Sequence, residues 1–177
     1  MNNKYLSNTL RFLGVATLQL LILNNVHLVG FVVPVVYIYF ILKLPFGTKR
    51  LVVLFLAFFL GLTIDLFVGT YGIHAAASTL IGACRHLFLK LSFGENEDDR
   101  ENSPSIREKG FYPFLGYVAA LSTLHITAFF LLENMGNAYY FLQLLFRIVA
   151  SAAFSIFLIT LLEYLTRAQR KKQRKGY

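Results

Sequence analysis

The sequence predicts an all-α integral membrane protein with six transmembrane helices arranged as three hairpins. Hydrophobic residues make up 56% of the 177 residues, and they gather in runs long enough to cross about 30 Å of hydrocarbon. The turns that close the hairpins contain no Lys or Arg, whereas nearly all the positive charge lies at the opposite helix ends. Because short cytoplasmic loops retain Lys and Arg, this bias places both termini in the cytoplasm. We therefore expect residues 1–177 to form one membrane domain.

Polar turns and basic loops set the boundaries of the predicted helices. The hairpin turns fall near Asn24, Gly69 and Asn134, and Lys49 and Arg50 separate the first hairpin from the second. A five-span arrangement would place a basic cluster outside the cell, which disfavours it. The predicted spans are residues 7–24, 27–44, 51–68, 72–91, 112–133 and 139–163.

The first hairpin carries the residues least suited to a spanning helix. Arg11 lies near the start of the first helix, so its side chain must extend toward the interface. Pro34 lies early in the second helix. Proline is accommodated in a membrane helix when the freed carbonyl finds another donor. We therefore still expect a helix over residues 27–44.

Two polar segments are expected on the cytoplasmic side. Residues 92–110 are rich in acidic, Gly, Asn and Ser residues, so they predict a cytoplasmic linker, and the acidic run at 95–101 is either a plain linker or a docking site. Residues 164–177 form a basic tail, expected to contact anionic lipid rather than nucleic acid. The basic residues assigned to lipid contact are Arg170, Lys171, Lys172, Arg174 and Lys175.

Asp65 and Arg147 are the two charges predicted to lie within spans and away from the cytoplasmic interface. A lone charge at depth costs about 2.5–3.5 kcal/mol, so each side chain should face the bundle and find a partner. The simplest expectation is an Asp65–Arg147 ion pair, with Glu133 as a competing partner for Arg147. A proton or ion relay is the functional alternative, but no series of further acids crosses the predicted bilayer.

Small residues indicate which helices pack most closely. Ala57, Gly61, Asp65 and Gly69 recur every four residues and share one helix face. The fourth and sixth predicted helices are also rich in Gly, Ala and Ser, which allow membrane helices to approach closely. We therefore expect the third, fourth and sixth helices to form the centre. The first, second and fifth should face lipid or a partner.

The sequence contains none of the common catalytic or cofactor motifs. There is no nucleophile elbow, no paired zinc histidines and no phosphate-binding glycine loop. Cys84 is the only cysteine, which rules out an internal disulfide or a cysteine-based metal site. The four histidines are scattered over the predicted helices and are expected to be packed or interfacial. We expect a protein that is not an enzyme and has no cofactor.

Residues 61–75 resemble the signature of the rod shape-determining MreD family. That signature is a Gly-Leu-x-x-Asp run followed by two glycines and an alanine as the chain turns into the next helix. The chain length, the six predicted spans and the basic tail agree with this resemblance. The matching residues are Gly61, Leu62, Asp65, Gly69, Gly72 and Ala75.

The resemblance implies a function as well as a fold. It implies a non-catalytic scaffold in the bacterial inner membrane that binds an MreC-like partner with a single span. Through that partner it would connect to actin-like MreB and the elongation peptidoglycan synthases, and so support cell shape. The family is similar in fold to the substrate-binding subunits of energy-coupling-factor transporters, so a small-molecule-binding subunit is the alternative. The first helix lacks the Ala-x-x-x-Ala docking motif usual in those subunits.

Overall fold

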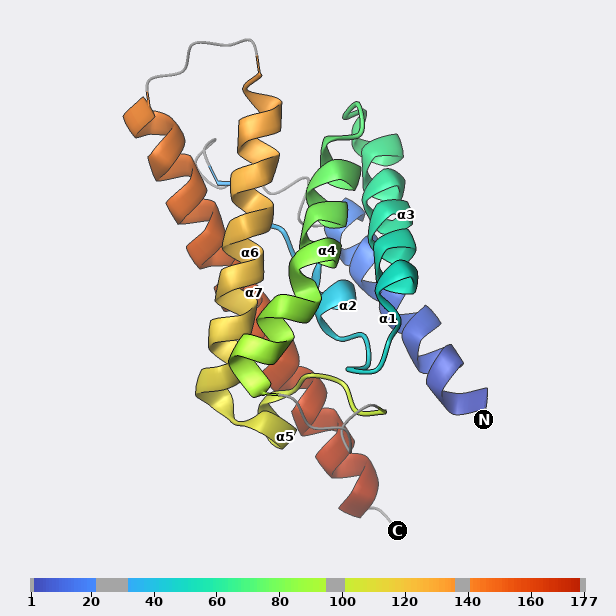
Figure 1. The fold of residues 1–177 in the computed structure, drawn as a ribbon. Helices are drawn as coiled ribbons and strands as arrows, with labels where there is room; N and C mark the ends of the chain where they lie inside the picture. Colours follow the sequence, from blue (N-terminus) through green and yellow to red (C-terminus); the bar gives the residue numbers. More distant parts are fainter. Residues whose placement is uncertain (1, 22–31, 95–100, 136–140, 176–177) are drawn as a thin grey trace.

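The computed structural model describes residues 2–21, 32–94, 101–135 and 141–175 (Figure 1). These residues form helices without a β-strand among them, which confirms the all-helical class. Five helices are long and two are single turns. They are α1 Asn2–Leu21, α2 Tyr39–Leu42, α3 Arg50–Val68, α4 Ile73–Phe93, α5 Ile106–Lys109, α6 Phe111–Glu133 and α7 Phe141–Lys175.

Three helices are long and apolar enough to cross a membrane by length and composition. They are α3, α6 and the Phe141–Thr166 part of α7. These helices indicate a membrane protein, and the remaining spans of the six-span arrangement stay a prediction. The last helix continues to Lys175, so the basic tail expected over 164–177 extends α7. The side chains at 167–175 lie outside the described part.

The second predicted helix is wrong over most of its length. A helix was expected over residues 27–44, but residues 32–38 are not helical and α2 covers only four residues. Residues 22–31 lie outside the described part. Pro34 supplies no backbone N–H, and the β-branched valines around it disfavour a helix. Residues 32–46, which we call the interrupted segment, instead run through the bundle as mostly irregular backbone.

Neighbouring helices enclose the interrupted segment. α4 packs against α3 on one side and α6 on the other, and α6 packs against α7 (Figure 1). Residues 34–44 are all buried, so this part of the second predicted span lies inside the protein and does not face lipid. The expected order of packing is wrong for the last two helices as well. The most apolar stretch is 44% buried in α6 but only 22% in α7.

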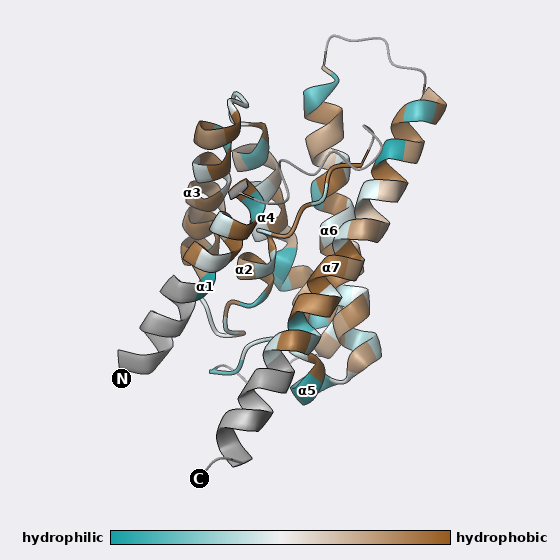
Figure 2. Cartoon of the chain, turned by 180° about the vertical axis from the view of Figure 1, so that it is seen from behind, coloured by the Kyte–Doolittle hydropathy of each residue, from teal (hydrophilic) through white to brown (hydrophobic). Residues whose placement is uncertain are grey.

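The outer faces of α3 and α7 are apolar. Phe55, Phe59, Phe146 and Phe157 are among their exposed large side chains. Seen from behind, much of the described length of both helices is coloured as hydrophobic (Figure 2). In a bilayer these faces meet lipid or another helix, because no backbone polar group on them needs water.

Candidate functional site

The turn between α3 and α4 is built around the buried carboxylate of Asp65. Oδ1 accepts hydrogen bonds from Thr70 Oγ1 at 2.5 Å and from the backbone N–H of His74 at 3.0 Å. Oδ2 accepts from the backbone N–H of Ala75 at 2.8 Å. A carboxylate at a helix N-terminus satisfies unpaired N–H groups and opposes the positive end of the helix dipole. Asp65 therefore fixes the start of α4 from the end of α3.

The glycines of the family-like motif fit this turn. A Cβ atom at Gly61 would lie 2.5 Å from the carbonyl oxygen of His74 and 2.6 Å from Cα of Ala75, so the two helices touch through backbone. Gly69 ends α3 with φ +77°, and Gly72 precedes α4 with φ +85°. Glycine takes this left-handed conformation without steric cost. Leu62 is partly buried on the same turn of α3 as Gly61.

The expected ion pair between Asp65 and Arg147 is wrong. All contacts of the Asp65 carboxylate lie within the α3–α4 turn described above. Arg147 instead lies 3.7 Å from Glu133, the competing partner, and its guanidinium stacks over Phe130 at 4.7 Å from the ring centroid. Asp65 pairs with the start of α4 instead, because a helix N-terminus is itself an attractive site for a carboxylate.

The structure brings polar side chains to a place where the sequence predicts none, the interrupted segment. From Tyr39 onward, most of its N–H groups bond to carbonyls within the segment, but those of residues 33, 35, 36 and 37 do not, so other groups must satisfy them. Two serines of α7 accept from the N-terminal part of the segment. The N–H of Val33 donates to Ser151 Oγ at 3.0 Å, and the N–H of Val35 donates to Ser155 Oγ at 2.9 Å.

A single side chain of α1 satisfies the next backbone groups. The Gln19 side chain donates through Nε2 to the carbonyl of Pro34 at 2.8 Å. Its Oε1 accepts from the N–H of Val36 at 2.8 Å and from the N–H of Tyr37 at 3.3 Å. Gln19 is buried, and its amide replaces the bonds that a helical turn would have supplied.

Carbonyl groups at the other end of the segment are satisfied by donors from three helices. Tyr117 of α6 donates to the carbonyl of Leu42 at 3.3 Å, and Arg11 of α1 donates to that of Lys43 at 3.2 Å. Arg85 of α4 donates to the next two carbonyls, described below. These carbonyls follow α2, and cations near a helix C-terminus oppose the negative end of its dipole.

Arg85 is a buried cation, 2% exposed, that bonds to backbone rather than to a carboxylate. Its Nη2 donates to the carbonyls of Leu44 and of Pro45, the latter at 3.4 Å. Its guanidinium links α4 to the interrupted segment.

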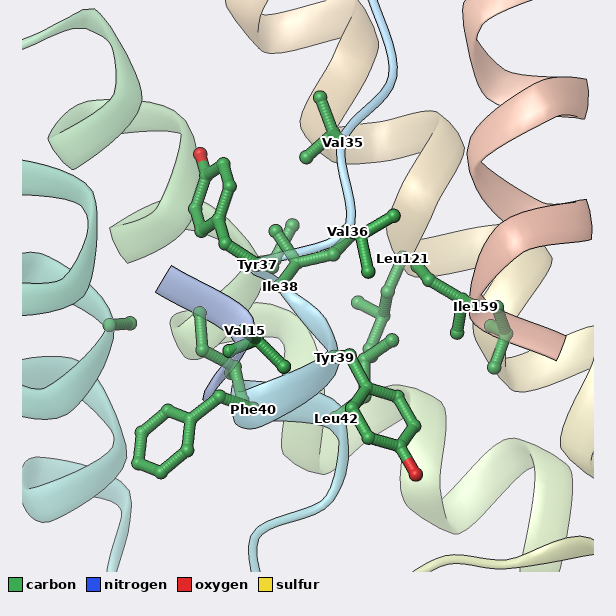
Figure 3. Packing of buried hydrophobic residues seen from close by; sticks show 14 of the residues in the cluster. Val15, Val35, Val36, Tyr37, Ile38, Tyr39, Phe40, Leu42, Leu121 and Ile159 are labelled. Carbon is green, nitrogen blue, oxygen red and sulfur yellow. The ribbon is translucent and has the colours of Figure 1, made fainter. Parts of the chain in front are cut away.

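Two tyrosines leave the segment in opposite directions and enter two separate polar clusters (Figure 3). In the first cluster, Tyr37 Oη lies 3.1 Å from His74 Nδ1 and 2.7 Å from His125 Nε2, and accepts from Ser78 Oγ at 3.2 Å. These four side chains are buried and come from the segment, α4 and α6. They form a neutral hydrogen-bonded centre, which we call the tyrosine–histidine cluster.

The second cluster contains an ion pair. Lys43 Nζ lies 3.0 Å from Glu163 Oε2 of α7, and Tyr39 Oη donates to the same oxygen at 2.7 Å. Lys43 also donates to the carbonyl of Pro104 at 2.6 Å. The N–H of Phe46 donates to the carbonyl of Asn102 at 2.9 Å. The cluster therefore joins the segment both to α7 and to the linker expected over 92–110.

Sequence reasoning placed some of these residues correctly and missed others. It singled out Asp65 and the motif glycines, which meet in one turn. It missed Gln19, Tyr37 and Glu163, whose partners are distant in sequence. One available signal was the presence of polar side chains inside apolar runs, since such side chains need partners within the membrane.

Within the described ranges, no group of three His, Cys, Asp or Glu side chains could hold a metal ion. Comparison of the chain with protein-family models, curated proteins and solved structures finds no match.

Proposed function

We propose that this protein is a non-catalytic scaffold of the bacterial inner membrane, of the MreD kind. It holds an MreC-like partner with a single span and, through it, supports cell shape and peptidoglycan synthesis. The observation that carries the proposal is the motif over residues 61–75. Its Gly61, Asp65 and Gly72 each have a defined part in the α3–α4 turn.

The packing of the bundle supports a role as a rigid platform. The polar side chains of the core bond mainly to the bundle's own backbone, as Gln19 and Arg85 do. The large apolar side chains of α3 and α7 point outward along two long helices. Lipid gives no hydrophobic drive between helices, so a partner helix must recognise such a face by shape and by small or polar residues.

The topology belongs to the same proposal and has a direct test. With Cys84 replaced, a cysteine at Thr70 should react with a membrane-impermeant thiol reagent in cells with a permeabilised outer membrane. A cysteine at Gly47 should react only after lysis. Labelling of Gly47 in intact cells would contradict the arrangement with both termini in the cytoplasm.

The alternative is a small-molecule-binding subunit of an energy-coupling-factor type transporter. The tyrosine–histidine cluster favours it, because several hydrogen-bonding groups converge at one buried point. The two proposals differ in what accompanies the purified protein: a membrane protein for the scaffold, and a small molecule for the transporter subunit.

Affinity purification from mild detergent tests the proposed function. The scaffold should bring down a membrane protein with one span, and depletion of the scaffold should make elongated cells round. Asp65→Ala should reduce the co-purified partner per molecule of scaffold, whereas Thr123→Ala, on an exposed position of α6, should not. A vitamin bound at near-equal stoichiometry, or growth restored by a vitamin supplement, would replace the scaffold proposal with the transporter one.

A further inference from the structure

Two buried polar atoms on α6, one of them in the tyrosine–histidine cluster, have no hydrogen-bond partner within the described part of the chain. They are Ser122 Oγ and His125 Nδ1, both on α6. Both side chains are fully buried, at 0% exposure, so water outside the protein does not reach them. An unpaired buried polar atom is costly, and native proteins pair nearly all of them.

The two atoms belong to one place on the helix. Ser122 and His125 are three residues apart, so they share a face of α6. Side chains in a helix lean toward its N-terminus, which carries the ring of His125 over the turn that holds Ser122. A single ligand atom between them can therefore contact both.

The rest of the cluster does not supply that contact in the described structure. A phenol hydroxyl can donate one hydrogen bond and accept two. Tyr37 Oη already contacts His74, His125 and Ser78, which accounts for all three. The partner of Ser122 and His125 must come from outside these groups.

The roles of the two ring nitrogens define the chemistry of the ligand. A neutral imidazole has one N–H donor and one bare nitrogen acceptor. Nε2 of His125 faces Tyr37, so Nδ1 takes whichever role Nε2 does not. A ligand that pairs with Nδ1 in either state, and with a serine hydroxyl, must both donate and accept. A hydroxyl group or a water molecule does this.

We propose that Ser122 and His125 form a binding site for one small hydroxyl-bearing ligand that completes the tyrosine–histidine cluster. The ligand is either a buried water or the hydroxyl of a small solute. Leu121, Ile126 and Phe129, which neighbour the two residues on α6, are themselves buried, so this part of α6 is closed to water outside the protein. Buried waters typically make about three hydrogen bonds, and this position offers two side-chain partners.

A double-mutant cycle measures whether the two residues share a ligand. Ser122→Ala removes the hydroxyl, and His125→Gln keeps a polar group toward Tyr37 while removing the counterpart of Nδ1. Thermal unfolding of the purified protein can be followed with a dye that reacts with Cys84. Each single change should lower Tm by about 3 °C, and the double variant should fall little further, because the same ligand is lost each time. Thr123→Ala, on an exposed position of α6, is the matched control and should leave Tm unchanged.

Independent effects would overturn the proposal. If the two groups are unpaired, Ser122→Ala removes a buried unsatisfied hydroxyl and should leave Tm unchanged or raise it, and the two effects should add. Native mass spectrometry of the wild type separates the two ligand sources once coupling is seen. Added mass at a one-to-one ratio that Ser122→Ala abolishes identifies a solute, and the bare protein mass identifies water. The scaffold proposal can fail while this site stands, because partner co-purification is a separate measurement.

Discussion

The α3–α4 hairpin and the interrupted segment solve the same problem in opposite ways. Both are apolar runs whose backbone groups must be paired away from water. In the hairpin, each helix pairs its own backbone and Asp65 pairs the first N–H groups of α4. The backbone groups of the interrupted segment are paired by side chains of other helices. Gln19 of α1 and Ser155 of α7 accept from its N–H groups, and Arg85 of α4 donates to its carbonyls. The hairpin depends on residues close in sequence, whereas the segment depends on the whole bundle.

The largest effect is expected at Gln19, which alone supports three backbone groups of the segment. Gln19→Leu leaves all three buried without a partner, at about 1–3 kcal/mol each. We expect a loss of roughly 3 kcal/mol or more, seen as a large fall in Tm or in the amount of folded protein. Gln143→Leu, at an exposed position of α7, is the matched control and should be tolerated. Equal behaviour of the two variants would mean that the segment does not depend on α1.

A second variant tests Gly61, where α3 approaches the backbone of α4. Gly61→Ala places a methyl group against the backbone of His74 and Ala75, which cannot move away as a flexible side chain could. Overpacking of this kind costs about 1–3 kcal/mol. We expect Tm to fall by roughly 2–4 °C for each kcal/mol lost. Gly116→Ala, where an added Cβ meets nothing within 4 Å, should have little effect.

Variants at Asp65 distinguish a role as a helix cap from a role in an ion pair. Asp65→Ala removes the acceptor for two backbone N–H groups, so we expect a loss of about 0.5–2 kcal/mol, typical of a cap. Asp65→Asn keeps an oxygen acceptor and should lose less. The double variant Asp65→Arg with Arg147→Asp should recover none of the stability lost on removing the Asp65 carboxylate, because the two residues are not paired in the structure. Recovery of Tm in that double variant would support an ion pair between Asp65 and Arg147.

The smallest effect on stability is expected in the basic tail. Neutralising Arg170, Lys171, Lys172, Arg174 and Lys175 should leave Tm unchanged, since the contacts described for the hairpin and for the interrupted segment are made by other residues. Binding to vesicles that contain anionic lipid should weaken, by about 1 kcal/mol for each basic residue near the surface. A fall in Tm comparable with that of Gly61→Ala would show that the tail supports the bundle.

The motif hairpin could be predicted from sequence because its signals are local. Apolar runs of sufficient length gave α3, α4 and α6, and the glycines marked the turn between the first two. The pairing of Arg147 with the competing partner Glu133 could also be predicted, since Glu133 is the last residue of α6 and Arg147 lies near the start of α7 in the same predicted hairpin. The cap at Asp65 was not predicted, because a lone acid in an apolar run suggests a counter-charge before it suggests a helix N-terminus.

By itself, the sequence determined that this is an all-helical protein with helices long and apolar enough to cross a membrane, and where the α3–α4 turn falls. Hydrophobic runs and glycines carry that information because helix hydrogen bonds join residues only four apart. Only the tertiary structure decided that residues 32–38 leave the helix, and that Tyr37 and Tyr39 enter separate polar clusters. An irregular segment is stable in an apolar interior only if distant side chains reach its backbone. The positions of Gln19, Ser155 and Arg85 around that segment exist only after the helices have packed.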